Sequence, residues 1–402
     1  MTPLAYLASL ALLLILGILV TYLSYKIKIP NVILLILLGV ALSYVPNPFN
    51  LSEPLISFDH TFLVTMGIFS LAIIVFESSS HFSFKEVDSV SSKALRITFV
   101  FTTFTLIGLT LAGKLLFPNR GWVSLMIFAA AMCGTSPDVV LSSFKKNTNN
   151  IIKTLQVESI VNTPINVLLP FIIIDFITAP EMAGSKAALI PLFGQAILMK
   201  IITGIGTGVL FGFILLRILK TNGKKKIAPV ILLAMALLTY VVAEALEGNG
   251  VLAVTFLGLI FGNSFLKRKS SIKNFSSTLS LSLEILIFIL IGFLIRVPLD
   301  LTFFVKTVAL FGIYILLRWL AILISLRKGK ETAKEKLFLA LNAPKGIAVA
   351  VVTFVLSVSN VPDISFSLDL IFSFILLSVI VSTIVAHFSD KFVEGKVEVN
   401  NL

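Results

Sequence analysis

The sequence predicts an all-α polytopic membrane protein with about thirteen transmembrane helices. Of its 402 residues, 57% are hydrophobic and only 13% are charged, and the mean hydropathy is +1.05. Soluble domains carry about 25% charged residues, so a soluble fold is excluded. Apolar runs of about 17–25 residues are long enough to cross a hydrocarbon core of ~30 Å, and a chain inside that core must be helical to satisfy its backbone groups.

Thirteen such runs follow one another, and no soluble domain separates them. They begin near residues 4, 30, 60, 93, 121, 151, 188, 226, 250, 274, 301, 335 and 365. We therefore expect a single transmembrane domain over residues 1–402.

The basic residues alternate between the two ends of these runs. Connections near 26–28, 85–96, 145–153, 217–226, 267–273 and 327–336, together with the C-terminal tail, hold 24 of the 32 Lys and Arg residues. This positive-inside pattern predicts a multi-pass cell-membrane protein with its N-terminus outside and its C-terminus in the cytoplasm. Basic loops of this kind face anionic lipid, so we expect membrane lipid, and no nucleic acid, as a partner.

Composition also argues against metal and enzyme chemistry. One cysteine, Cys133, and three scattered histidines predict no transition-metal site and no cofactor. No nucleophile–base constellation is evident, so an enzyme is not expected.

Two spans carry backbone breakers in their middles. They contain CGTSPDVV at 133–140 and LNAPKGIAVAVV at 341–352, and their orientations are opposite. Interrupted helices at matching positions of two halves indicate the binding site of a secondary transporter. The halves would be inverted repeats of about 1–178 and 226–390, joined by a linking helix at 188–220. The alternative is that Pro and Gly merely kink two bundle helices.

The first break places a carboxylate inside the membrane. Ser136, Pro137 and Asp138 fit the N-cap, first and second positions of a new helical segment. A carboxylate in the hydrocarbon core costs roughly 2.5–3.5 kcal/mol, whereas a cap contributes about 1 kcal/mol. We therefore assign Asp138 an ion-binding role beyond capping.

The next span supplies a second polar cluster. Glu158 and Asn162 share a helix face, and Ser159 and Thr163 follow them directly. Their oxygens suit a hard alkali cation. Helix–helix hydrogen bonding is the alternative, and we prefer it for Asn166.

Four basic residues, Lys200, Lys306, Arg318 and Lys345, lie inside apolar spans, and two of them bear on the site. Arg318 needs a carboxylate partner there, for which Glu158 is the first candidate and Glu284 the second. Lys345, beside Pro344, is expected to compensate exposed carbonyl groups at its own, second break.

Several stretches, taken in order, resemble sodium/proton exchangers of the monovalent cation/proton antiporter superfamily, of archaeal and bacterial type. They are AIIVFESSSHFSFKEV, LLTYVVAEALEGNGVLAVTFLGLIFGN, FILIGFLI, LLRWLAI and APKGIAVAVV. The resemblance covers essentially the whole chain. It implies a core domain with crossed broken helices that moves against a dimerisation domain, a homodimer, and exchange of Na⁺ or Li⁺ for H⁺.

Only some residues of this sequence match the motifs of the family. Thr135-Ser136-Pro137 stands where the family has Thr-Asp-Pro, and Thr163 replaces the aspartate of Glu-Ser-Leu-x-Asn-Asp. Glu158 and Arg318 match the family's buried ion pair, and Lys345 replaces the arginine of Gly-Pro-Arg-Gly.

These departures lead to a hypothesis about the site. Asp138 would take over the titratable role lost at Thr163, with Thr135, Ser136, Glu158, Ser159 and Asn162 around it and Arg318 and Lys345 as supporting charges. One carboxylate that holds either a proton or a cation would make exchange obligatory. The alternatives are a potassium/proton antiporter and a non-transporting sensory relative.

Overall fold

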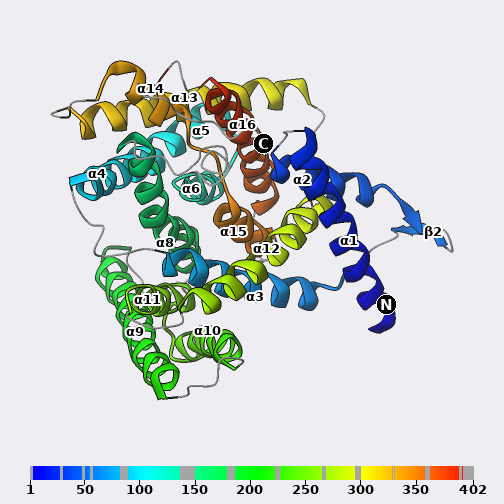
Figure 1. Ribbon diagram of the computed structural model, residues 1–402. Helices are drawn as coiled ribbons and strands as arrows, with labels where there is room; N and C mark the ends of the chain where they lie inside the picture. Colours follow the sequence, from blue (N-terminus) through cyan, green and yellow to red (C-terminus); the bar gives the residue numbers. More distant parts are fainter. Residues whose placement is uncertain are drawn as a thin grey trace.

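The computed structural model describes most of the chain. It covers residues 3–27, 30–47, 50–54, 58–81, 89–135, 150–178, 186–221, 227–264, 269–294, 300–327, 329, 331–357, 363–388 and 392 of the 402. Helices dominate this part (Figure 1). They are α1 (Pro3–Ile27), α2 (Asn31–Ser43), α3 (His60–Ser80), α4 (Ser89–Phe104), α5 (Thr110–Leu116), α6 (Trp122–Ala131), α8 (Asn150–Thr178), α9 (Lys186–Thr221), α10 (Ala228–Ala245), α11 (Gly250–Gly262), α12 (Lys269–Leu294), α13 (Leu301–Ser325), α14 (Ala333–Leu341), α15 (Ile347–Ser357) and α16 (Ile364–His387).

The helices confirm the predicted polytopic fold. Each of the thirteen predicted spans begins within five residues of a described helix start. The fourth span is α4 and α5 joined by a π-helical turn at Thr105–Leu109, and the twelfth is divided into α14 and α15. Within the described ranges, eight helices are long and apolar enough to cross a membrane.

Four of the remaining helices, α2, α6, α11 and α15, are apolar but shorter. α6 and α15 have 10 and 11 residues because each adjoins one of the predicted breaks. α2 and α11 have 13 residues each, which corresponds to about 20 Å at 1.5 Å per residue. The sequence did not predict the small antiparallel hairpin of β1 (Pro46–Asn47) and β2 (Asn50–Pro54), which follows α2.

The helices pack as two groups. We call α4, α5, α6, α8 and α13–α16 the core bundle, and α1–α3 with α9–α12 the scaffold bundle. In the core bundle α8 packs against α4 and α6, and α13 packs against α4 and α14. In the scaffold bundle α11 packs against α9 and α3, and α12 packs against α2. Figure 1 shows most of the core bundle above α3 and above the group formed by α9, α10 and α11.

Two helix pairs in the scaffold bundle approach closely through glycine. A Cβ on Gly39 of α2 would overlap the carbonyl oxygen of Ile289 on α12, and one on Gly292 would overlap that of Ile36. On α11, a Cβ on Gly262 would overlap the carbonyl of Ser80 at the end of α3. Small residues allow such backbone approach, which holds helices together where lipid removes the hydrophobic driving force.

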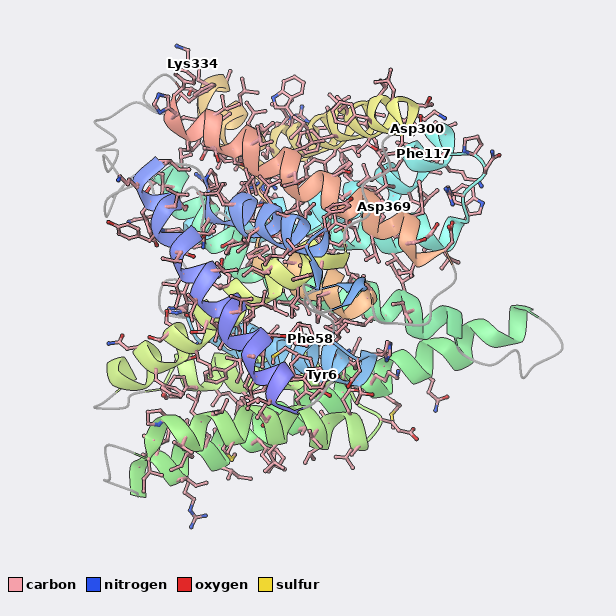
Figure 2. All side chains as sticks on the ribbon, turned by 90° about the vertical axis from the view of Figure 1, so that its right-hand side faces the viewer. Tyr6, Phe58, Phe117, Asp300, Lys334 and Asp369 are labelled. Atoms are coloured by element: carbon pink, nitrogen blue, oxygen red, sulfur yellow. The ribbon has the colours of Figure 1, made fainter. Side chains whose placement is uncertain are left out.

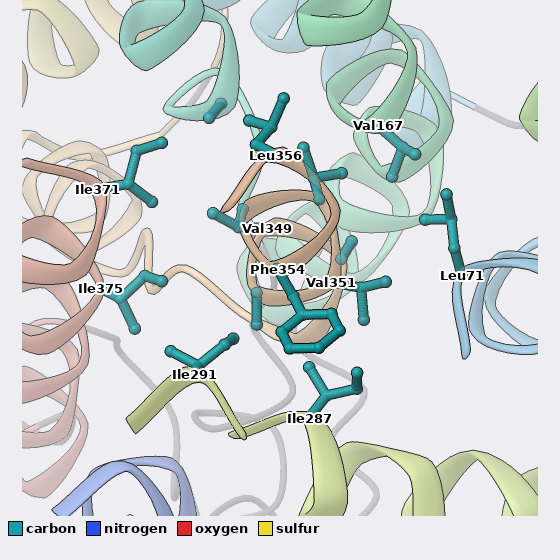
Figure 3. Packing of buried hydrophobic residues seen from close by; sticks show 14 of the residues in the cluster. Leu71, Val167, Ile287, Ile291, Val349, Val351, Phe354, Leu356, Ile371 and Ile375 are labelled. Carbon is teal, nitrogen blue, oxygen red and sulfur yellow. The ribbon is translucent and has the colours of Figure 1, made fainter. Parts of the chain in front are cut away.

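Helix α15 is the main contact between the bundles. Figure 3 shows its Phe354 and Val351 among Leu71 of α3 and Ile287 of α12, and all four side chains are buried. On the opposite side α15 packs against α8 and α16 of its own bundle. The two bundles therefore meet through apolar side chains around Phe354.

Ion pairs fix both ends of the core bundle. Arg120, before α6, pairs with Asp363 at the start of α16 at 3.0 Å. Lys93 of α4 pairs with Glu331, before α14, at 2.5 Å. Figure 2 shows Lys334, in the first turn of α14, at the upper left of the core bundle and Asp300, the N-cap of α13, at its upper right. α13 and α14 therefore start from opposite sides of the core bundle.

Candidate functional site

The first break begins where α6 ends, and α8 supplies its hydrogen-bond partners. Asn162 Nδ2 donates to the carbonyl of Cys133 at 2.9 Å and to Thr135 Oγ1 at 3.4 Å. The Gly134 amide donates to Asn166 Oδ1 at 2.9 Å. All five residues are buried. Two asparagines one helical turn apart thus replace backbone bonds that a continuous helix would have made.

Gly134 is required by this close contact. A Cβ at this position would overlap the side-chain amide of Asn166. Asn166, for which the sequence favoured hydrogen bonding between helices, is bonded to the break itself. Its role is to hold the interrupted backbone of the neighbouring helix.

The second break separates α14 from α15 and is also buried. Its five residues, 342–346, are inaccessible or nearly so. Asn342 Nδ2 donates to the carbonyl of Phe338 at 2.9 Å, and the Lys345 amide donates to Ser378 Oγ of α16 at 3.0 Å. Side chains thus satisfy part of this break as well.

The Lys345 side chain connects the two breaks. Its Nζ donates to the carbonyls of Met132 and Gly134 at 2.7 and 2.6 Å, and to Tyr314 Oη at 2.6 Å. The expectation that Lys345 compensates the carbonyls of its own break is therefore wrong. Its flexible four-carbon stem carries the ammonium group across to the first break, where α6 ends with unsatisfied carbonyls.

Arg318 pairs with Glu158, the first of its two candidate partners. Nη1 to Oε1 is 2.7 Å and Nη2 to Oε2 is 3.1 Å, and both side chains are almost completely buried. Arg318 Nε also donates to the carbonyl of Leu339 at 3.3 Å. A buried pair is tolerable when its geometry is good and further hydrogen bonds support it; here the pair is bidentate, and Nε makes an additional bond.

An aromatic side chain lies beside both buried cations. The ring of Phe101 on α4 has its centroid 4.7 Å from Arg318 Cζ and 5.9 Å from Lys345 Nζ. The two cations and Glu158 therefore form one cluster. Its described members carry two basic groups and one carboxylate, so a second carboxylate nearby would balance a protonated Lys345.

The predicted site residues fall into three sets. The structure brings Thr135 and Asn162 together at the first break, and it pairs Glu158 with Arg318. Ser159 is buried next to Glu158, and its Oγ donates to the carbonyl of Gln156 at 3.1 Å. Ser136 and Asp138 lie outside the described residues, as does the side chain of Thr163.

Tyr314 was not among the site residues predicted from the sequence. This residue is fully buried on α13, four residues before Arg318 and on the same helix face. A tyrosine one turn from a buried arginine, in an otherwise apolar span, was the available signal.

Metal-ligating side chains do not gather in the described residues. No group of three or more His, Cys, Asp or Glu side chains that could hold a metal ion occurs there. Cys133 is buried, and its Sγ lies 3.3 Å from the carbonyl oxygen of Ala129.

Known proteins share both sequence and fold with this chain. The family model for the transmembrane sodium/hydrogen exchanger matches residues 10–389. The chain is 27% identical to Na⁺/H⁺ antiporter 1 of Methanocaldococcus jannaschii over 365 residues, which is 85% of the chain and 80% of that relative. It is 26% identical to the K⁺/H⁺ antiporter NhaP of Alkalimonas amylolytica over 322 residues, 78% of the chain but only 55% of that relative.

A solved structure agrees with the fold. The sodium proton antiporter MjNhaP1 from Methanocaldococcus jannaschii at pH 8 superposes with a TM-score of 0.76 at 22% sequence identity, covering 95% of this chain and 100% of that one. At this identity the match concerns the fold. Together with the family match over nearly the full length, it shows that the chain belongs to the sodium/hydrogen exchanger family.

Proposed function

We propose that this protein is a secondary active antiporter that exchanges a monovalent cation, sodium in the first instance, for protons. One observation carries the proposal: the Lys345 ammonium of one interrupted helix binds the carbonyls that end the other, so the two breaks meet inside the bundle. Interrupted helices that meet at a repeat interface form the ion sites of secondary transporters. The proposed ligands of the site are the transported Na⁺, Li⁺ or K⁺ and H⁺, and no cofactor or enzymatic step is involved.

Oxygen atoms at the first break are suited to hold the cation. Asn162 Oδ1 is buried and has no hydrogen-bond partner among the described residues, while Nδ2 of the same amide holds the break. An orphaned buried carbonyl oxygen is costly unless a ligand or water completes it. Thr135 and Ser159 add hydroxyl oxygens nearby, and the proposed set is completed by Ser136, Asp138 and Thr163.

Asp138 is the proposed exchangeable carboxylate. Glu158 is fully occupied by Arg318, so it stabilises the bundle and does not carry the proton. Asp138 is three residues beyond Thr135, and a carboxylate there would balance the second buried cation, Lys345. A single acid that binds either a proton or a cation couples the two flows by competition.

We also propose that the transmembrane domain comprises inverted repeats of about 1–178 and 226–390, linked by a helix near 188–220. The packing supports the division, because α2 against α12 corresponds to α11 against α3 when the repeats are superposed in order. In the core bundle, α6 against α16 corresponds in the same way to α14 against α8. Movement of the core bundle along the apolar contact around Phe354 would expose the site to alternate faces.

The family and the distribution of basic residues support a proposal for oligomeric state, location and orientation. We propose a homodimer in the cell membrane with the N-terminus outside and the C-terminus in the cytoplasm. The basic loops at one end support this orientation.

The test is exchange in proteoliposomes under sodium, lithium and potassium gradients. Wild type should acidify or alkalinise the lumen when a cation gradient is imposed, and Asp138→Asn should abolish the response. Asp300→Asn is the matched control, because Asp300 caps α13 away from the breaks and asparagine also caps helices. Normal exchange by Asp138→Asn would remove that residue from the mechanism.

Potassium/proton exchange is the second candidate. The Alkalimonas relative is named a K⁺/H⁺ antiporter, and the usual aspartates are Ser136 and Thr163 here. A response to potassium alone would select this function. If wild type responds to none of the three cations, the protein is a non-transporting sensory relative.

A further inference from the structure

We infer that Tyr314 is a positioning residue for Lys345, whose hydroxyl serves both charge states of the lysine and so lets it gain and lose a proton between the two breaks. The inference rests on the proposed exchange function and assigns a proton-linked role to a pair that lies outside the proposed cation ligands. It follows from the hydrogen-bonding capacity of the atoms around Lys345 Nζ.

An ammonium group has three N–H donors and no acceptor. Lys345 Nζ has three partners within hydrogen-bond distance, namely the carbonyls of Met132 and Gly134 and the hydroxyl of Tyr314. The protonated lysine is therefore completely satisfied at a site with no exposed surface.

The neutral amine has different requirements. It keeps two N–H donors and gains one lone pair, which needs a donor. Backbone carbonyls only accept, whereas a tyrosine hydroxyl can also donate. The carbonyls of Met132 and Gly134 can keep their bonds to the amine while Tyr314 turns its O–H towards the lone pair. Of these three partners, Tyr314 alone can reverse its role.

The Tyr314 ring is held in place for this task. It stacks on Phe311 with centroids 5.8 Å apart, and it makes edge contacts with Phe101 and Phe374, also at 5.8 Å. These rings come from α13, α4 and α16. Rotation of the hydroxyl hydrogen therefore suffices for the change of role, and no side chain has to move.

Charged and titratable groups surround the pair on several elements. Among the described residues they are Arg318 on α13, Glu158 on α8 and Cys133 at the first break. α16 contributes the uncharged Ser378, and α4 contributes Phe101. Arg318 and Glu158 neutralise each other. Among these described groups, a change in the charge of Lys345 therefore alters the electrostatic environment of the first break most directly.

The direct test is ¹⁹F NMR of 3-fluorotyrosine incorporated at position 314 alone. This analogue keeps the hydroxyl and nearly the same shape, so the protein should fold. Across the neutral to alkaline range, we expect a titration step in the fluorine shift that disappears in Lys345→Arg, because a guanidinium does not lose its proton. Absence of a step, or the same step in Lys345→Arg, would overturn the inference whether or not the protein transports sodium.

Transport supplies the second readout. Tyr314→Phe removes an acceptor from the ammonium and a donor from the amine, and the bond to the charged form is the stronger one. The midpoint of the pH profile of exchange should therefore move towards acid, by about one pH unit for a tenfold change in proton occupancy. Tyr240→Phe, on α10 in the scaffold bundle, should leave the profile unchanged.

The two proposals fail in distinguishable ways. An equal loss of rate at every pH in Tyr314→Phe would mean that the residue only fills space, and the inference would be wrong. Absence of cation-driven proton movement in wild type would overturn the antiporter function, while the fluorine titration would still decide the role of Tyr314.

Discussion

The second break and helix α15, which follows it, are held by different kinds of contact. At the break itself, Lys345 is held by directional hydrogen bonds to another helix end and to Tyr314. Two turns further on, Phe354 of α15 contacts the scaffold bundle through apolar side chains, as Figure 3 shows. Directional bonds fix one geometry, whereas apolar contacts in a membrane depend on shape alone. The break is thus built to be rigid, and the contact between bundles is built to be exchanged for another of similar shape.

The largest effect should come from removing a buried polar interaction next to the breaks. Arg318→Leu leaves Glu158 buried without its partner, which should cost about 3–5 kcal/mol of stability. Thermal unfolding of the purified protein measures the loss. The double variant Glu158→Leu with Arg318→Leu should recover much of it, and a single variant as stable as wild type would contradict the fixed role of the pair.

Gly134→Ala should have the next largest effect. The added methyl group would overlap the Asn166 side chain and separate α8 from the first break, with a loss of about 1–3 kcal/mol if the Gly134 amide is left unsatisfied. Exchange activity should fall along with stability. Gly206→Ala in α9 is the control, because nothing lies within 4 Å of a Cβ there. Equal tolerance of both variants would mean that the hydrogen bond to Asn166 is dispensable.

A small change on the apolar side should have a smaller effect. Ile287→Val removes one buried methyl group from the α12 surface that faces Phe354. The expected cost is about 0.5–1.5 kcal/mol, seen as a lower unfolding temperature. The pH profile of exchange should stay unchanged, since no titratable group is touched. A shifted profile would show that the contact between bundles takes part in proton binding.

The ion pair between Lys93 and Glu331, at the end of the core bundle, should matter least. Burial raises the pKa of Glu331, but the hydrogen bond and the charge from Lys93 outweigh burial, so the pKa lies below its usual range. The contribution of the pair is present above the unfolded-state pKa of the glutamate and is lost as the pH falls through the lower, folded value. Lys93→Gln should therefore cost less than about 1 kcal/mol at neutral pH.

The difference between Lys93→Gln and wild type should vanish in acid. Unfolding temperatures measured from neutral to acidic pH provide the check. A deficit that persists at acidic pH would assign the effect to packing of the lysine stem instead of its charge.

Much of the fold could be predicted because the membrane limits the options. Apolar length and the alternation of basic loops located every described span, including α14 and α15 on either side of Pro344. The pairing of Arg318 with Glu158 followed from the same constraint, since a permanent charge in hydrocarbon needs a carboxylate. The small β hairpin was missed because its residues lie in a short connection with no hydropathy signal.

The details of the site depend on which groups the long side chains contact in the folded protein, and sequence spacing does not give these contacts. Lys345 stands next to its own break in the chain, yet its ammonium binds carbonyls more than two hundred residues away. Tyr314 contributes through a hydroxyl that meets a lysine from another element. The roles of Ser136, Asp138 and Thr163 remain predictions from the sequence.

Sodium binding to the purified protein, followed by calorimetry as a function of pH, tests the central claim most directly. If one buried carboxylate at the crossing binds a proton or a cation in turn, the apparent sodium Kd should rise about tenfold per unit fall in pH once protons compete for the site. The same titration of Asp138→Asn should show no such dependence. A sodium Kd that is independent of pH in wild type would contradict competition at a shared site.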